Sequence, residues 1–156
     1  MPDDNLALPR DFRDFVRLLQ AHGVEFVLVG AYAVGAHGRV RATGDIDFLY
    51  RASAGNVQRL CDAMRAFGAP AHLIDPEFLQ SGGSVTQIGN APRRIDLLES
   101  ISGVTFDAVW SRAIQSGIDG ETMPVISFED LLVNKRSTGR KKDIQDAKFL
   151  LSRRKR

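Results

Sequence analysis

The chain has 156 residues, of which 44% are hydrophobic and 26% are charged, an ordinary composition for a soluble globular protein of one domain. Its single cysteine, Cys61, excludes an internal disulfide and a zinc cluster of cysteines, and no apolar run approaches the roughly 20 residues that a membrane-spanning helix needs. Because the N-terminus MPDDNLALPR is acidic and lacks a hydrophobic signal core, we expect a cytoplasmic protein that does not contact a membrane.

The net charge of +2 is unevenly distributed along the chain. From residue 134 to the end there are ten Lys and Arg against two Asp, a net charge of +8, whereas residues 1–133 carry −6. A basic terminal segment attracts the phosphates of a nucleotide or of a nucleic acid. For the last five residues alone, SRRKR, a solvated and frayed helix end is the explanation that we favour.

The chain begins with a predicted helix, a strand and a short second helix. Residues 9–22 carry apolar side chains at helical spacing, with Pro9 suited to the first turn and Gly23 to the end of the helix. Residues 25–30 form a short continuous apolar run, which is typical of a buried strand. The small residues 31–38 that follow are compatible with a helix.

The next two elements are a strand and an amphipathic helix. In the strand, residues 45–50, the side chains of Asp45 and Asp47 point to one face and the apolar side chains between them to the other. Residues 55–68 carry an apolar stripe that includes Cys61, which we expect to be buried as a small hydrophobic side chain.

Two strand pairs separated by a short helix follow. Residues 84–89 and 93–100 are joined by Asn-Ala-Pro, which indicates an antiparallel hairpin. Residues 105–112 are expected to form the short helix. Residues 113–127 are expected to form a further strand pair that turns at an Asp-Gly step.

Two helices close the chain. Ser127, followed three residues later by Asp130, is a capping-box start for the first of them. The second spans about residues 142–152 and is expected to bury three apolar side chains: Ile144, Ala147 and Leu151.

The paired acids on the strand at 45–50 are the first candidate for chemistry. Two carboxylates side by side, those of Asp45 and Asp47, repel each other unless a cation neutralises them, and a hard divalent ion with oxygen ligands fits that role. On its own, however, an Asp-x-Asp pattern more often marks an exposed strand face. Arg41 and Thr43, just before the pair, would put a cation and a hydroxyl at the rim of the same cleft.

Two further features favour a site for a phosphate and a metal. The apolar strand that ends at Gly30 is followed by small residues beginning with Ala31, so backbone N–H groups can approach a phosphate closely, although a plain strand-to-helix turn would have the same sequence. Asp96 lies in a strand that otherwise reads as core, so its carboxylate needs a partner. A salt bridge to Arg93 or Arg94 would satisfy it as well as a metal ion would.

Together these residues resemble the signature of the DNA polymerase beta-like nucleotidyltransferase superfamily. The string VGAYAVGAHGRVRATGDIDFLY has the apolar strand, the glycine turn, the short helix and the acid-apolar-acid strand, and RRIDLLES supplies a third acid, Asp96. The closing segment ISFEDLLVNKRSTGRKKDIQDAKFL is similar to the tail of small bacterial nucleotidyltransferase-like proteins, many of which belong to toxin–antitoxin or abortive-infection systems. The resemblance covers roughly residues 12–152.

The resemblance implies an α+β, nucleotidyltransferase fold, in which a mixed β-sheet is flanked by helices and followed by a C-terminal helix pair. We expect residues 1–156 to form a single domain with three parts: a core (9–126), the C-terminal helices (127–152) and a basic tail (153–156).

The chemistry implied by the resemblance is transfer of a nucleoside monophosphate from a nucleoside triphosphate to an acceptor hydroxyl, with release of pyrophosphate. Two Mg²⁺ ions would clamp the attacking and leaving oxygens. Asp45 and Asp47 would bridge both ions, and Asp96 would complete the ion that activates the acceptor. The acceptor itself stays open: a protein hydroxyl, a tRNA end or a small molecule.

Further residues would bind the triphosphate. The turn at Gly30-Ala31 would hold the β- and γ-phosphates, and Lys135 and Arg140 would neutralise them, although surface charge on a helix pair explains these two cations nearly as well. The full set of nucleotide-binding candidates is Gly30, Ala31, Arg41, Thr43, Lys135 and Arg140. We expect removal of Lys135 to leave folding intact, because a long side chain with an exposed charge contributes little to a core.

The remaining acids of the tail favour a structural role. We expect Asp143 and Asp146 to pair with Lys142 or with the arginines and to hold the last helix in place.

Two other functions compete with catalysis. One is a catalytically silent protein of the same fold that serves as a partner of a cognate toxin or antitoxin, which the replacement of a usual Gly or Ser by Ala31 mildly favours. The other is a nucleic-acid-binding module that uses the +8 tail, although no helix-turn-helix with a basic recognition helix is evident.

Overall fold

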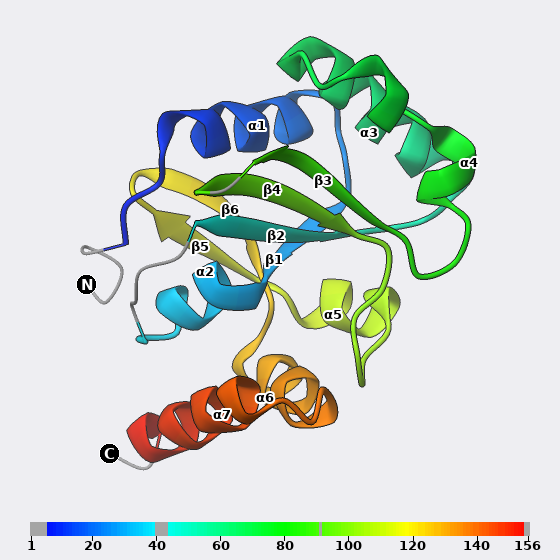
Figure 1. Cartoon of the computed structure of the whole chain (residues 1–156). Helices are drawn as coiled ribbons and strands as arrows, with labels where there is room; N and C mark the ends of the chain where they lie inside the picture. The colour runs from blue at the N-terminus through cyan, green and yellow to red at the C-terminus, as the bar shows by residue number, and fades with distance from the viewer. Residues whose placement is uncertain (1–5, 40–43, 91, 155–156) are drawn as a thin grey trace.

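A mixed sheet organises the protein (Figure 1). The computed structural model describes residues 6–39, 44–90 and 92–154, and in these ranges six strands lie in the order β3-β4-β2-β1-β6-β5. The strands are β1 (Phe26–Val29), β2 (Asp45–Tyr50), β3 (Val85–Asn90), β4 (Arg93–Leu98), β5 (Ile114–Ile118) and β6 (Glu121–Val125). In the same ranges the α-helices are α1 (Arg10–Ala21), α2 (Gly30–Ala36), α3 (Ala54–Phe67), α4 (Pro76–Leu79), α5 (Phe106–Arg112), α6 (Phe128–Ser137) and α7 (Lys141–Arg154), and a 3-10 turn spans Ala71–Leu73.

The pairing of the strands confirms the two expected hairpins. β3 and β4 are antiparallel neighbours, as are β5 and β6, while the central strand β2 pairs antiparallel with β1 and parallel with β4. The second hairpin turns at Asp119 and Gly120, both of which have positive φ, the backbone conformation that a tight two-residue hairpin requires. The elements for which both bounds were predicted begin and end within about two residues of the observed ones, whereas α4 and the 3-10 turn were not predicted.

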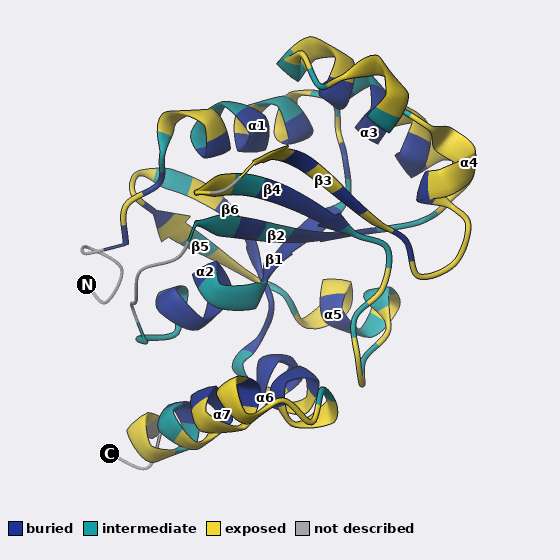
Figure 2. Cartoon of the chain, in the orientation of Figure 1, coloured by how far each residue is buried: buried dark blue, intermediate teal, exposed yellow. Residues whose placement is uncertain are grey.

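The two faces of the sheet carry different layers (Figures 1 and 2). Helices α1 and α3 cover one face, which is apolar, and there the rings of Phe15 and Phe48 lie 6.0 Å apart between their centres. Because side chains alternate along β2, Ile46 and Phe48 point into this core, and Asp45 and Asp47 point to the opposite face. That second face is the one on which α2, α5, α6 and α7 lie. The expected stripe on the first helix and the buried Cys61 are both confirmed.

The last helix packs against the protein with a different face from the one that its apolar residues predicted. Ile144 is 37% exposed, whereas Asp143 and Asp146 are buried together with Ala147 and Leu150. The face of α7 that packs inward is thus partly charged, because its acids meet cations of neighbouring elements. Within the described ranges, none of the helices combines the length and the apolar character that crossing a lipid bilayer requires.

Candidate active site

The parallel pairing of β2 with β4 brings the three candidate acids together on one face of the sheet. In this register Asp47 is the direct neighbour of Asp96, and Asp45 is the direct neighbour of Arg94. Asp96 is 7% exposed, while Asp45 and Asp47 are half-buried. Residues directly opposite in neighbouring strands share a face of the sheet, so Asp45, Asp47 and Asp96 lie on one face.

The pKa of Asp47 reflects both its burial and its acidic neighbours. The pKa of its carboxyl is raised to about 7, mainly by burial and further by the adjacent Asp96, which accepts a hydrogen bond from the protonated form, and by Asp45. The ammonium of Lys135 opposes the shift. Near neutral pH this cluster therefore binds a proton readily, because burial disfavours the charged carboxylate and the neighbouring carboxylates repel it.

Arg94 supplies positive charge to two of these acids. Its Nε donates to Asp96 Oδ1 at 2.8 Å, and its Nη2 donates both to Asp96 Oδ2 at 3.1 Å and to Asp45 Oδ2 at 3.0 Å. The salt bridge that the sequence allowed for Asp96 thus exists, and it is made by Arg94, while the same guanidinium also reaches Asp45. In the part of the chain that the structure describes, no three His, Cys, Asp or Glu side chains are arranged so that they could hold one metal ion.

Gly30, which ends β1 and opens α2, is fitted closely against Asp47. Its φ is +71°, and a Cβ built on it would lie 2.1 Å from Asp47 Oδ2, so no other residue fits without displacing that carboxylate. The pairing of Val29 with Asp47 explains the contact, because the turn after β1 then lies directly beside the acid. Ala31 borders the same space, and its own Cβ is accommodated there.

A cavity of about 290 Å³ lies in front of these residues. Its walls come from the sheet, from the turn before α2 and from the C-terminal helices. The lining residues are Gly30, Ala31, Asp45, Asp47, Arg94, Asp96, Lys135, Arg140, Lys142 and Asp143. Seven of the nine candidate site residues therefore meet in one cavity; the other two, Arg41 and Thr43, lie outside the described residues. Arg94 and Lys142 were not among the candidates, and only the general excess of cations in the tail pointed toward Lys142.

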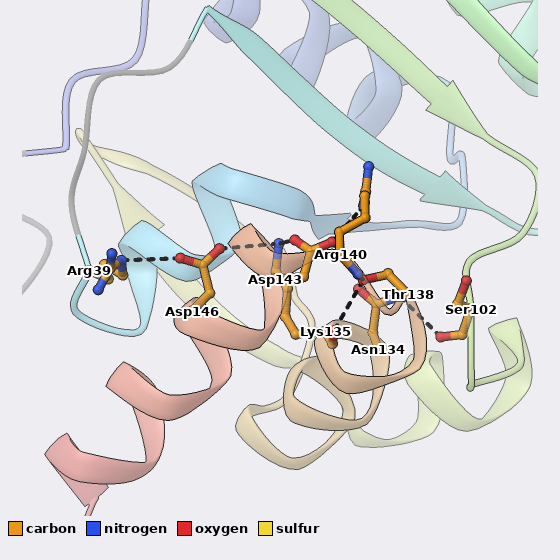
Figure 3. Close-up of polar contacts among 8 residues, drawn as sticks. All are labelled: Arg39, Ser102, Asn134, Lys135, Thr138, Arg140, Asp143 and Asp146. Carbon is orange, nitrogen blue, oxygen red and sulfur yellow. Dashed lines mark hydrogen bonds and ion pairs between the residues drawn. The ribbon is translucent and has the colours of Figure 1, made fainter.

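Lys135 is buried rather than exposed (Figure 3). Only 6% of it is accessible, and its Nζ lies 3.0 Å from Asp143 Oδ1 and 3.6 Å from Asp146 Oδ2. The premise that Lys135 has an exposed charge is therefore wrong, and we instead expect its removal to destabilise the fold, since both partners are buried carboxylates that would lose a cation. Surface charge is likewise excluded as an explanation for Lys135.

The acids of α7 connect three elements (Figure 3). Asp146 joins Lys135 of α6 to Arg39, whose Nε lies 3.1 Å from Asp146 Oδ1 just beyond α2. Asp143 accepts from Lys135, from Arg140 Nε at 2.8 Å and from Thr138 Oγ1 at 2.7 Å.

Burial opposes the ionisation of Asp143, but the hydroxyl of Thr138 and the two cations together hold the pKa of its carboxyl below the ordinary value. Asp143 and Asp146 thus hold the last helix as expected, through Lys135 and two arginines, while Lys142 faces the cavity.

Comparisons with known proteins bear on the family and the fold of the chain. The family model for a nucleotidyl transferase of unknown function (DUF2204) matches residues 9–153. The crystal structure of the lincosamide antibiotic adenylyltransferase LnuA with bound lincomycin is similar over 95% of this chain and 99% of that one, with 17% identity and a TM-score of 0.61. The solution structure of the antibiotic-resistance factor ANT(2'')-Ia is similar over 91% and 81%, with 15% identity and a TM-score of 0.52.

At these identities the two likenesses show a shared fold, and they confirm the expected nucleotidyltransferase architecture. No curated protein sequence matches the chain significantly.

Proposed function

Since the chain belongs to the family of nucleotidyl transferases of unknown function (DUF2204), we propose that it transfers a nucleoside monophosphate from a nucleoside triphosphate to an acceptor hydroxyl. The chain is a nucleotidyl transferase; the proposal concerns how it works. One observation carries it, namely that Asp47 has Asp96 as its direct strand neighbour and the glycine turn of Gly30 packed on its carboxylate. A phosphate chain held at the turn would lie against the acids.

The donor atoms are of the kind that a divalent metal such as Mg²⁺ binds, although within the described residues no three acids are arranged to hold one ion as they stand. Asp45, Asp47 and Asp96 provide carboxylate oxygens, the ligands that hard divalent cations prefer, and their mutual repulsion is only partly relieved by Arg94. When bound, the metal would stabilise negative charge on the phosphate and lower the pKa of the acceptor hydroxyl. These three residues would hold it, as one ion or as two.

The chain's own cations would bind the triphosphate. Lys135, Arg140 and Lys142 line the cavity beside the acids, and a triphosphate that enters with a metal needs positive charge on its far side. The backbone N–H groups at Gly30 and Ala31 would contact the terminal phosphates. Lys135 is fixed by Asp143 and Asp146, so its ammonium would be oriented before the nucleotide arrives.

For the acceptor, we favour a small hydroxyl-bearing molecule. The two similar structures are described as an adenylyltransferase for a lincosamide antibiotic and an antibiotic-resistance factor, which supports a small-molecule acceptor and ATP as the donor. A protein hydroxyl or a tRNA end remains a second class of acceptor, and a cognate toxin or antitoxin remains a prediction from the sequence resemblance. A catalytically silent partner has less support, because the three acids and the glycine turn are all kept.

Labelled nucleoside triphosphates test this proposal directly. The protein is incubated with each of the four in Mg²⁺ with a small-molecule extract, a protein extract or tRNA, and label transfer is followed. We expect transfer to one of these classes for the wild type and none for Asp47→Asn. Release of pyrophosphate that continues unchanged in Asp47→Asn would contradict the assignment of the site.

A further inference from the structure

Arg94 lies between two of the acids that would hold a metal ion. It lies two residues before Asp96 on β4 and directly opposite Asp45 on β2, so the strand register itself puts a guanidinium between these two acids. Its three hydrogen bonds, of 2.8 to 3.1 Å, go to both oxygens of Asp96 and to one oxygen of Asp45. Bidentate arginine–carboxylate pairs of this kind are among the strongest in proteins.

Both carboxylate oxygens of Asp96 are therefore already used by a cation. A divalent ion bound to the same oxygens at roughly 2.0–2.6 Å would sit within about 5 Å of the guanidinium, and two cations that close repel each other strongly in a half-buried site. Three carboxylates share this face of the sheet, yet the described residues contain no three His, Cys, Asp or Glu side chains arranged to hold one metal ion.

We propose that Arg94 is a built-in counter-ion that competes with the divalent metal for Asp45 and Asp96, and that it moves onto the triphosphate when metal and nucleotide bind together. The inference rests on the proposed function. Arg94 is 29% exposed and lines the cavity that also holds Arg140 and Lys142, so a guanidinium released from the acids faces the space where the phosphates would bind.

Two consequences follow from this exchange of partners. Metal alone binds weakly, because it must displace the guanidinium into water without a new partner. Metal and triphosphate bind cooperatively, because the phosphates offer that guanidinium an anion in place of the carboxylates.

The test is a calorimetric titration of the nucleotide-free protein with Mn²⁺, which stands in for Mg²⁺. We expect Arg94→Gln to bind Mn²⁺ at least about tenfold more tightly than the wild type, since removing a competitor raises the fraction of competent sites. Arg93→Gln is the matched control, because Arg93 is the adjacent arginine on β4 and points to the other face; it should bind Mn²⁺ as the wild type does. Equal or weaker binding by Arg94→Gln would overturn the inference.

A second titration separates this inference from the proposed function. If the wild type binds Mn²⁺ with a nucleoside triphosphate but Arg94→Gln shows no tighter binding of Mn²⁺ alone, the inference fails and the function stands. If no variant binds Mn²⁺ under either condition, both fail. Should Arg94→Gln not fold, Arg94→Lys replaces it: a lysine keeps the charge without the bidentate fork, so a smaller tightening is expected, and no tightening overturns the inference.

Discussion

At the scale of single residues, Gly30 combines a left-handed backbone with close packing against Asp47, so the site depends on a glycine at this position. Replacing it by Ala would strain a left-handed backbone and push the Asp47 carboxylate, which a new Cβ would meet at 2.1 Å. We expect Gly30→Ala to lose about 2 kcal/mol or more of stability and to weaken metal–nucleotide binding. Urea unfolding and calorimetry measure both effects.

Gly68 supplies the control for that substitution. It also has a positive φ, +89°, but a Cβ there would meet no atom within 4 Å. Gly68→Ala should therefore show the backbone strain alone, about 1 kcal/mol, with nucleotide binding unchanged. If the two variants behaved alike, close packing of Gly30 against Asp47 would not matter to the site.

The raised pKa of Asp47 predicts how the stability of the metal-free protein depends on pH. Because burial and neighbouring acids raise its pKa to about 7, the folded protein binds more protons than the unfolded chain between about pH 4 and pH 7. Stability from this group is therefore lost as the pH rises through that window. Asp47→Asn removes the loss, so it should be more stable than the wild type at pH 8, by up to about 4 kcal/mol, and equal to it near pH 4.

Melting curves in a chelator at pH 4, 6 and 8 test this. A stability difference that stays constant across the three pH values would show that Asp47 is not the group that titrates.

The ion pairs between α6 and α7 lead to another prediction about stability. Lys135→Met should cost about 3 kcal/mol, because it leaves the carboxylates of Asp143 and Asp146 buried with one cation fewer. Lys142 borders the same cavity but is exposed, so Lys142→Met should change stability by less than about 0.5 kcal/mol. Chemical denaturation of the two variants compares them. An equally small effect of both would mean that the network around Lys135 does not hold the helices.

Most secondary-structure elements could be predicted because each depends on local patterns. Alternation along β2 placed Asp45 and Asp47 on one face, and apolar spacing gave α1 and α3. The neighbour relation between Asp47 and Asp96 required the family resemblance, because no local pattern states which strands are adjacent. The inward face of α7 was misassigned to Ile144 because apolar residues alone were counted, whereas the buried positions are held by paired acids.

For the molecule as a whole, part of the excess positive charge from residue 134 to the end faces the cavity, and part of it is paired with buried acids. Lys135, Arg140 and Lys142 face the acid cavity, and Lys135 and Arg140 are also tied to Asp143, so part of the +8 is used within the protein. This favours a nucleotide, rather than a nucleic acid, as the source of the phosphates that these cations bind. The cavity that the sheet and the C-terminal helices line holds both carboxylates and cations, an arrangement that a metal-bound triphosphate complements.

Calorimetric titration of the purified protein with the four common nucleoside triphosphates, with Mg²⁺ and then with a chelator, tests the central claim most directly. At least one triphosphate should bind in Mg²⁺, and its affinity should fall at least about tenfold in the chelator and in Asp45→Asn/Asp47→Asn, since the carboxylates hold the metal that neutralises the phosphates. Absence of binding by any of them at millimolar concentration, or binding that neither the chelator nor the double substitution weakens, would contradict the assignment of Asp45, Asp47 and Asp96 as the metal and nucleotide site.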